Sequence, residues 1–327
     1  MSRPDFVRAA EILAAADDVA LACHVNPDAD ALGSMLGLAN ALEARGTRTV
    51  ASFPNEPLEA PRWASWLPGA DRLVPAKSFP KTPAVMVTCD CASFDRLGSL
   101  GHTVSNASEV IWIDHHRSND GLGTVPLIDP TASSTCEMVF RLLEAMGGGM
   151  TADTAICLYA GLVTDTGRFQ YQATTPETLR IAARLREHDF DHAALVRALY
   201  EDNDPSFLRL LGTALGRMAE IPEAGVIWTY LTQADLADAG VGPGDTDDLI
   251  DVLRTARDVD VAAVLKQQRD GRFKVSVRSR GGHDLAAVAA SFGGGGHRLA
   301  AGYTSEHGPE GTIERLVAAL RQAPVAS

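Results

Sequence analysis

The sequence has no apolar run long enough to cross a membrane. A spanning helix needs about 18 consecutive apolar residues, and polar or charged residues interrupt every hydrophobic stretch well before that length. The N-terminal segment, residues 1–18, carries charges at intervals, which is typical of an amphipathic helix rather than of a signal peptide. We therefore expect neither a membrane partner nor a secretory leader.

Cysteine is scarce, with five residues in the whole chain. Most of them lie inside apolar runs, and their spacing fits no zinc motif. Cys89 and Cys91 are expected to be packing residues rather than a redox pair. An odd number of cysteines without a signal peptide favours reduced thiols and a cytoplasmic location.

Basic residues are outnumbered, because the chain has 29 Lys and Arg against 42 Asp and Glu, a formal net charge of −13. Proteins that hold long nucleic acid without sequence preference usually present a broad basic surface. The composition argues against such a surface over the whole molecule. It favours small anionic ligands held by a few placed cations or metals. The apolar fraction of 46% is ordinary for a folded globular protein.

The first half of the chain alternates short apolar runs with helical patterns. Four runs are continuously apolar and have the length of buried strands, as in a parallel sheet covered on both faces. Apolar periodicity predicts helices at residues 29–45, 134–146 and 151–163. This order of elements predicts a doubly wound α/β domain. The predicted strands are residues 19–25, 47–53, 84–90 and 109–114.

The second half predicts a helical connector and a smaller α/β domain. Thr175 and Pro176 begin one more helix, and residues 207–219 are typical of a connector. The elements expected after it are a strand at 225–232, a helix at 246–257, a hairpin of 259–268 with 273–280, and a short helix at 284–292. With 327 residues, two domains are expected. We place them at residues 1–190 and 225–327, joined by a helical linker at 191–224.

Acidic and imidazole side chains recur where the predicted elements end. In open α/β sheets, ligands bind outside the carboxyl ends of the strands. We therefore expect these side chains to meet at one edge of the sheet. They are His24, Asp28 and Asp30 after the first strand, Asp90 at the end of the third, Asp114, His115 and His116 at the end of the fourth, and Asp165 after the helix at 151–163.

Four of these side chains, Asp28, Asp30, Asp90 and Asp165, would bring four negative charges into one pocket. Without a counter-charge, their repulsion would raise the carboxyl pKa values and destabilise the fold. Two divalent cations would neutralise the cluster formally. Mixed oxygen and imidazole ligands suit Mn²⁺, and to a lesser extent Mg²⁺, Co²⁺ or Zn²⁺.

Each of these residues also has a simpler interpretation. Asp28 and Asp30 can cap the helix that follows them. His115 and His116 can belong to a solvated loop, and Asp165 can end a helix. Their ordered recurrence at the ends of successive elements favours the metal site over these separate explanations.

Taken together, these residues resemble the DHH phosphoesterase superfamily, specifically its DHH–DHHA1 branch. That branch includes the bifunctional oligoribonuclease and pAp phosphatase and the cyclic di-AMP phosphodiesterases. The resemblance covers roughly residues 5–320. The matching motifs are His24-x-x-x-Asp28-x-Asp30-x-x-Gly33-Ser34, Asp90, Asp114-His115-His116, Asp165 and Gly293-Gly294-Gly295-Gly296-His297-x-x-Ala300-Ala301-Gly302.

The resemblance implies a role for each residue of the cluster. Asp114 is implied to orient His115 behind the metals, as metal-bound histidines usually require, and His116 is implied to face the substrate phosphate. Asp90, Asp114 and His116 are thus the implied catalytic residues. The implied ligands are His24, Asp28 and Asp90 for one metal, and Asp30, Asp90, His115 and Asp165 for the second, with Asp90 bridging the two.

A two-metal site of this kind predicts hydrolysis of a phosphate ester. Two cations about 3.5–4 Å apart can hold a shared water, lower its pKa and direct it at phosphorus. His116 is expected to donate to the phosphate, which gains charge as it reacts. Arg117 and Asn119 follow it and are candidates for the same role, although both also fit a surface loop.

The second domain carries the predicted substrate loop. Backbone amides of glycine can approach an anion closely, and the run at 293–296 resembles the recognition loop of the DHHA1 domain. Arg278 is expected to bind a terminal phosphate, whereas Arg280 fits a solvated edge equally well. The other residues of this predicted substrate site are Ser279, Gly295, Gly296 and His297.

The resemblance implies a homodimer that hydrolyses short oligoribonucleotides, pApA and pAp. A cyclic di-AMP phosphodiesterase is the first alternative, since it would share the site. An inorganic pyrophosphatase would be expected to carry a lysine- and arginine-rich phosphate site in place of the glycine loop. An inactive nucleotide sensor is disfavoured because all six predicted metal ligands are present.

Overall fold

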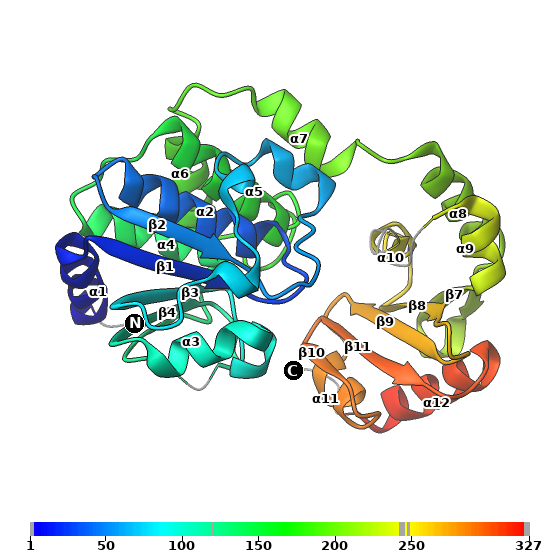
Figure 1. The fold of residues 1–327 in the computed structure, drawn as a ribbon. Helices are drawn as coiled ribbons and strands as arrows, with labels where there is room; N and C mark the ends of the chain where they lie inside the picture. Colours follow the sequence, from blue (N-terminus) through cyan, green and yellow to red (C-terminus); the bar gives the residue numbers. More distant parts are fainter. Residues whose placement is uncertain (1–2, 120, 242–245, 247–248, 324–327) are drawn as a thin grey trace. The chain divides into compact units, whose positions relative to one another are not determined.

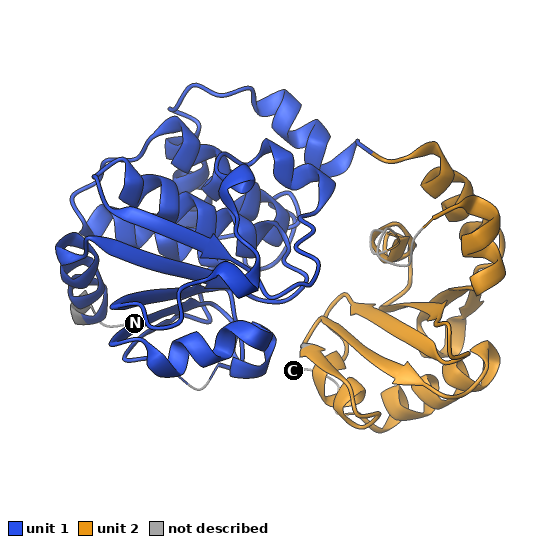
Figure 2. Cartoon of the chain, viewed as in Figure 1, with its two compact units in different colours: residues 1–202 blue, residues 203–327 orange. Residues whose placement is uncertain are grey.

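The computed structural model describes residues 3–119, 121–241, 246 and 249–323. The chain divides into two compact units, residues 1–202 and 203–327 (Figure 2). The segment predicted as a helical linker, 191–224, is shared between them. Its helix α7 (His192–Tyr200) belongs to the first unit, and α8 (Pro205–Gly216) belongs to the second.

The first unit is built on a five-stranded parallel sheet, in the order β2-β1-β3-β4-β5. The predicted parallel α/β fold is confirmed. β5 was not predicted, because Pro126 interrupts its short apolar pattern. A proline is tolerated there because β5 is an edge strand. The strands are β1 (Asp18–Cys23), β2 (Arg48–Ser52), β3 (Val85–Cys89), β4 (Glu109–Asp114) and β5 (Val125–Ile128).

Helices cover both faces of this sheet (Figure 1). α2, α4 and α5 pack on one face, over Leu21, Val87 and Ile111. The short helix α3 and the turns before it cover the other face, over Met86 and Trp112. The helices of the first unit, besides α7, are α1 (Arg3–Ala15), α2 (Ala29–Glu43), α3 (Gly101–Asn106), α4 (Thr135–Ala145), α5 (Ala152–Asp165) and α6 (Pro176–Leu185).

Helix α2 lies between the sheet and α5 and is buried along almost its whole length. A helix that is apolar all round belongs in a core. Two glycines let α5 approach closely: a Cβ added at Gly33 would lie 2.4 Å from the carbonyl oxygen of Cys157, and one at Gly37 would lie 2.8 Å from Leu158 Cδ2. This close contact fixes the N-terminal end of α2, where Asp28 and Asp30 lie.

The second unit is a six-stranded mixed sheet, in the order β10-β11-β9-β8-β7-β6. Only the β7–β8 pair is parallel among the strand pairs described. The predicted hairpin is confirmed as β8 and β9, with Gly271 in the turn at φ +86°. The strands are β6 (Ala219–Ile221), β7 (Val226–Leu231), β8 (Val261–Gln267), β9 (Phe273–Ser279), β10 (Gly295–His297) and β11 (Ala300–Ser305).

Helices pack on both faces of the second sheet and form two separate apolar clusters. Of the helix predicted at 246–257, the described part is helical at Leu249–Leu253, and residues 247 and 248 lie outside the described chain. The helices are α8, α9 (Gln233–Ala239), α10 (Leu249–Leu253), α11 (Leu285–Ala290) and α12 (Pro309–Gln322). Through the described ranges, no helix has the length and apolar character needed to traverse a bilayer.

Gly33→Ala should destabilise the first unit, because the new methyl group would meet the α5 backbone rather than a movable side chain. We expect the free energy of unfolding to fall by about 1–3 kcal/mol, measured by chemical denaturation followed by circular dichroism.

Gly212→Ala is the matched control. Gly212 lies in α8, and no atom lies within 4 Å of a Cβ added there. Alanine favours a helix over glycine by up to about 1 kcal/mol, so this variant should be unchanged or more stable. Equal losses in both variants would contradict the packing role of Gly33.

Candidate metal centre

The sheet register brings three of the predicted residues to one edge. Cys23 pairs with Cys89, and Cys89 pairs with Ile113, so β1, β3 and β4 end side by side. His24, Asp90 and Asp114 therefore lie at neighbouring strand ends. Asp90 adopts a left-handed backbone conformation, with φ +55°, which is uncommon outside glycine and is tolerated best by Asp and Asn.

The N-terminus of α2 supplies two more carboxylates. Asp28 is the N-cap, and its Oδ1 accepts hydrogen bonds from the backbone amides of Asp30 and Ala31 at 3.1 and 3.0 Å. The simpler interpretation of Asp28 as a cap is therefore correct. It does not exclude the metal site, because one ligand atom of Asp28 also lies within 4.8 Å of ligand atoms of His24 and Asp90.

Three overlapping groups of side chains can each hold a cation: His24 with Asp28 and Asp90; Asp30 with His115 and Asp165; and Asp90 with His115 and His116. His115 Nε2 lies 3.4 Å from Asp165 Oδ2, 3.7 Å from Asp90 Oδ1 and 3.9 Å from Asp30 Oδ2. Across the cluster, His24 Nε2 lies 3.6 Å from Asp90 Oδ2. Asp90 thus presents one oxygen to each side.

Helix α4 points its N-terminus at the same carboxylates. The two oxygens of Asp30 accept from the amides of Thr135 and Cys136 at 2.6 and 2.9 Å. The Thr135 hydroxyl donates to Asp90 Oδ1 at 2.8 Å. A helix N-terminus carries partial positive charge, so α4 offsets part of the repulsion between Asp30 and Asp90.

Asp114 is buried behind His116. Its Oδ1 lies 2.6 Å from His116 Nδ1, and its Oδ2 accepts from Asn119 Nδ2 at 2.8 Å. The expectation that Asp114 orients His115 is wrong, because His115 Nδ1 instead lies 3.3 Å from the carbonyl oxygen of Ala132. In the Nδ1-protonated tautomer this carbonyl leaves His115 Nε2 facing the carboxylates.

Asn119 supports Asp114 instead of extending into solvent. Its side chain is buried, and its amide also donates to the carbonyl oxygen of Cys91 at 3.1 Å. Its Oδ1 accepts from the amide of Gly121 at 3.0 Å. The amide nitrogen predicted to contact substrate is thus engaged within the protein, whereas Arg117 is exposed.

The carboxyl pKa values of the cluster reflect its burial and its closely spaced charges. Burial, together with the neighbouring Asp90, raises the pKa of Asp30 to about 7. Burial and the charges of Asp30, Asp90 and Asp28 raise the pKa of Asp165 well above its usual range. Burial also acts on Asp90, but its hydrogen bond from His24 and the charges of His115 and His116 outweigh this and lower its pKa.

The imidazoles respond in the opposite sense. Burial alone would lower the pKa of His24 and of His115, but the adjacent carboxylates outweigh it, and both pKa values are raised. In the absence of cations, protons therefore neutralise the cluster. Divalent cations would take the place of those protons, and the set of carboxylate oxygens and imidazole nitrogens fits them.

The predicted substrate residues of the second unit lie on two strands, β9 and β10, that both pair with β11. Arg278 of β9 and His297 of β10 both pair with Ala300 of β11. The hydroxyl of Ser279 is held at 3.2–3.3 Å from the carboxylate of Asp260. The side chain of His297 lies outside the described part of the chain.

Two glycines of this strand pair meet different surroundings. Gly296 has φ +141°, and a Cβ there would lie 2.6 Å from the carbonyl oxygen of Ala300. No atom lies within 4 Å of a Cβ added at Gly295. Only Gly296 is therefore required to be glycine by its conformation and its neighbours.

Comparison with known families decides the affiliation. Residues 18–162 match the N-terminal domain of the DHH family, and residues 223–324 match the DHHA1 domain. A protein from Thermus thermophilus, named bifunctional oligoribonuclease and PAP phosphatase NrnA, is 35% identical over 96% of this chain and 92% of its own length. The chain belongs to the DHH family.

Two further proteins align with this DHH-family chain over most of their length. NrnA of Bacillus subtilis is 29% identical over 88% of each protein. The crystal structure of an exopolyphosphatase-related protein from Bacteroides fragilis superposes with a TM-score of 0.92 at 26% identity, over 98% of this chain and 96% of the other. The DHH domain and the DHHA1 domain are thus aligned together in each.

Thr135 and Cys136 were not anticipated as parts of the DHH site. The sequence does signal the start of a helix at Ser133-Ser134-Thr135, and Ser134 is the N-cap of α4. Nothing in the sequence joins that signal to Asp30, which precedes Thr135 by 105 residues. The register of tertiary packing decides that contact.

The charge of the DHH cluster predicts a pH-dependent affinity for metal. Protons on His24, His115 and Asp30 must leave before a cation binds, and the pKa values of all three are raised. We expect the apparent affinity for Mn²⁺ to increase as the pH is raised from about 6 to about 8. Calorimetry in buffers of different ionisation enthalpy should show proton release on binding.

His102→Ala is the control for this measurement. His102 is exposed and belongs to none of the three ligand groups. Its loss should leave the affinity and the proton release unchanged, whereas His115→Ala should reduce both. An affinity that does not change with pH would contradict the protonated cluster.

Proposed function

We propose that this chain is a metal-dependent phosphoesterase that hydrolyses short oligoribonucleotides, pApA and 3′-phosphorylated nucleotides such as pAp. The observation that supports it best is the set of three overlapping ligand groups, two of which share Asp90, together with the hydrogen bond between His116 and the buried Asp114. Relatives named oligoribonuclease and PAP phosphatase support the same substrate class.

We assign one cation to His24, Asp28 and Asp90, and a second to Asp30, Asp90, His115 and Asp165. Oxygen and nitrogen donors without a thiolate favour Mn²⁺, with Mg²⁺ or Co²⁺ as alternatives. When bound, such cations supply positive charge that polarises a phosphoryl oxygen and acidifies a water molecule. Hydrogen bonds from the first turn of α4 position Asp30 and Asp90 to bind these cations.

His116 is the proposed proton donor. Burial would lower its pKa, but the hydrogen bond to Asp114 and the charge of Asp90 raise it. A protonated His116 can donate from Nε2 to a phosphate oxygen while Asp114 accepts from Nδ1. Asp114 is then a positioning residue, and Asn119 holds Asp114 in turn.

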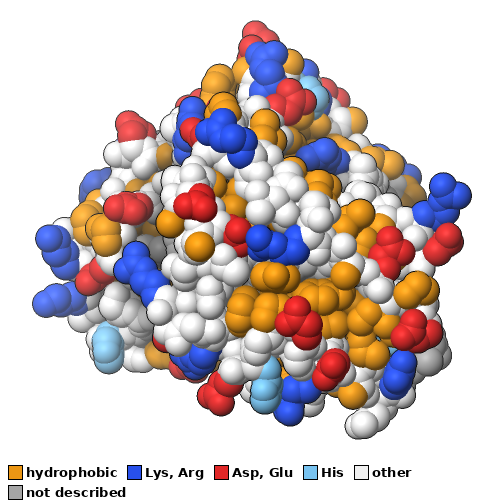
Figure 3. All heavy atoms as spheres, turned by 90° about the vertical axis from the view of Figure 1, so that its right-hand side faces the viewer, with side chains coloured by type: hydrophobic (Ala, Val, Ile, Leu, Met, Phe, Trp, Pro, Cys, Tyr) orange, Lys and Arg blue, Asp and Glu red, His pale blue; other side chains and the backbone are white. Residues whose placement is uncertain are grey.

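The DHHA1 unit is proposed to bind a phosphate of the substrate. The glycine amides at Gly295 and Gly296 can approach an anion, and Arg278, Ser279 and His297 lie on or beside the same strands. On the face in Figure 3, acidic and basic side chains are interspersed. Together with the net charge of −13, this supports a small nucleotide substrate over long nucleic acid.

We also propose a cytoplasmic homodimer. All five cysteines are free and buried, as expected for a protein that works in a reducing compartment. The second subunit rests on the family resemblance alone.

Turnover of a substrate panel with Mn²⁺ tests the proposal. We expect pAp, pApA and a dinucleotide to be hydrolysed faster than a long RNA, cyclic di-AMP or pyrophosphate. Asp90→Asn should lower kcat/KM by about 100-fold or more, because both cation sites lose a ligand. Asp71→Asn, at an exposed position of the same unit, should retain full activity.

Other outcomes of the panel would identify other functions. Pyrophosphate as the best substrate would exclude the oligoribonuclease. Preference for cyclic di-AMP would indicate a cyclic dinucleotide phosphodiesterase. Binding of nucleotides without turnover of any would indicate a sensor.

Asp114→Asn tests how His116 is positioned. The variant should keep its affinity for Mn²⁺, since Asp114 is in none of the ligand groups. We expect kcat to fall by about 10–100-fold with little change in KM. Because Asp114 raises the pKa of His116, the basic limb of the pH–rate profile should move to lower pH. A loss of activity without that movement would assign Asp114 a merely structural role.

A further inference from the structure

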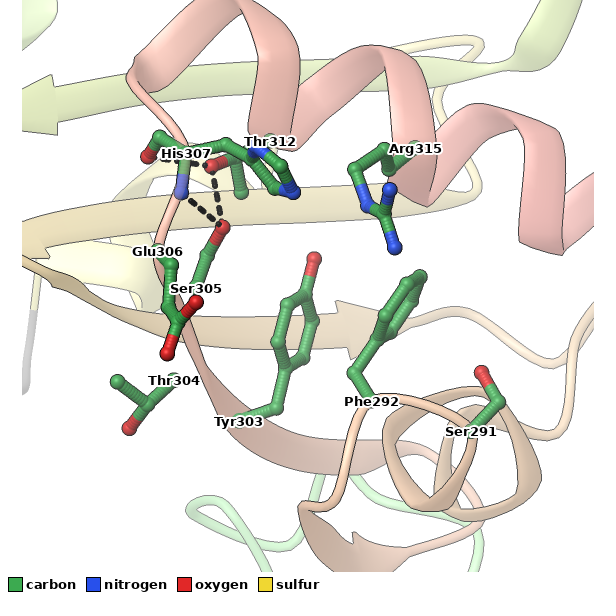
Figure 4. A pocket seen from close by; sticks show the side chains of 9 residues that line it. All are labelled: Ser291, Phe292, Tyr303, Thr304, Ser305, Glu306, His307, Thr312 and Arg315. Carbon is green, nitrogen blue, oxygen red and sulfur yellow. Dashed lines mark hydrogen bonds between the residues drawn. The ribbon is translucent and has the colours of Figure 1, made fainter.

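The second unit contains a cavity of about 280 Å³ that the proposed chemistry does not use. It lies between β11, the residues that follow α11 and the first turns of α12 (Figure 4). The side chains that line it are Ser291, Phe292, Tyr303, Glu306, His307 and Arg315, together with Thr304, Ser305 and Thr312.

Tyr303 is the unusual member of this lining. Its side chain is 94% buried, since 6% of its surface is exposed, and its ring stacks on Phe292 at 4.6 Å between centroids. Its hydroxyl has no hydrogen-bond partner in the described ranges. Figure 4 shows the hydroxyl directed into the cavity, toward the space between His307 and Arg315.

A buried hydroxyl without a partner costs free energy. The other buried hydroxyls of the lining avoid this cost. Ser305 and Thr312 bond to one another at 2.7 Å, and Thr312 also donates to the carbonyl oxygen of His307 at 3.0 Å. Tyr303 therefore offers a donor that is positioned but not used.

Arg315 supplies a positive charge to the lining of the cavity. Arg315 is exposed and forms no ion pair among the residues described. Helix α12 begins at the other end of the lining, beside Glu306 and His307, with Gly308 as its N-cap. Glu306 lies at the end of the cavity away from Arg315 (Figure 4).

We propose that this cavity binds a small oxyanion, a phosphate or carboxylate group, that accepts from the Tyr303 hydroxyl and the Arg315 guanidinium. Phe292 supplies an apolar wall for the rest of the ligand. All of its residues lie in the second unit, and it shares none of them with the metal centre. It does not depend on the proposed hydrolysis.

A ligand bound in the cavity would affect the glycine run at 293–296 through direct contacts. Phe292 immediately precedes Gly293, and a Cβ added at Gly294 would lie 2.5 Å from Tyr303 Cβ. A ligand that holds the Phe292–Tyr303 stack would therefore restrain the backbone from which β10 begins.

Thermal unfolding of the full-length chain in excess chelator provides the test, because chelation prevents an anion from binding through metals. Sodium phosphate and sodium benzoate are the probes, and sodium chloride at the same ionic strength is the reference. The variants are Tyr303→Phe and Arg315→Ala, with Arg321→Ala, an exposed arginine in the last turn of α12, as the control.

We expect one probe to raise the midpoint of the wild-type protein above the chloride reference, and the better probe identifies phosphate or carboxylate as the ligand group. Tyr303→Phe should unfold at the same or a higher temperature without anion, because it removes an unpaired hydroxyl. Its affinity for the probe should fall about tenfold or more. Arg315→Ala should show a similar fall, and Arg321→Ala should behave as the wild type.

Two results would overturn the proposal. One is a wild-type midpoint that phosphate and benzoate leave at its chloride value. The other is a shift of equal size in Tyr303→Phe, Arg315→Ala and the wild type, which would mean that the anion acts elsewhere. Neither readout uses catalytic turnover, so failure of this proposal and failure of the proposed hydrolysis are distinguishable.

Discussion

The repulsion among three closely spaced carboxylates, two of them buried, is the main constraint on the first unit. Burial and the charges of neighbouring carboxylates raise the pKa of Asp30 and of Asp165, whereas the hydrogen bond and charges of the nearby histidines lower the pKa of Asp90. Three features of the chain offset this cost: the imidazoles, the N-terminus of α4 and the hydroxyl of Thr135. Thr135, in the first turn of α4, follows Asp30 by 105 residues. The fold around the site therefore holds the carboxylates close together although they repel one another. Protons neutralise them when no cation is bound.

That requirement explains why α2 is packed so tightly. Its first turn holds Asp30 at the end of α4, and a shift of α2 along α5 would break both amide contacts with that carboxylate. Gly33 and Gly37 remove the side chains that would keep the two helices apart. The parallel sheet contributes in the same way, because its register aligns the ends of β1, β3 and β4. Close packing of α2 and the register of the sheet thus fix the distances between the charged side chains of the cluster.

The sequence was sufficient to predict the individual strands and the side chains at their ends. It was not sufficient to predict the contacts between segments that are far apart in the chain. Continuous apolar runs predicted the parallel strands, and charged residues at their ends predicted which side chains would meet. The edge strand β5 was missed because Pro126 breaks its pattern. The contact of Asp30 with Thr135 spans 105 residues and has no local signature. The partner of Asp114 was mistaken because adjacent histidines point in different directions, and only the backbone of the turn decides which ring reaches the carboxylate.

The thiols around the cluster have a chemical consequence of their own. Cys23, Cys89 and Cys136 are fully buried, and burial together with nearby carboxylates raises the pKa of each. They therefore remain neutral sulfhydryl groups at physiological pH. A thiolate, in contrast, would attract soft metals or react with peroxide. The ligand groups of the cluster consist of carboxylate oxygens and imidazole nitrogens, without a thiolate. No thiolate is therefore present beside the cluster as a nucleophile for peroxide.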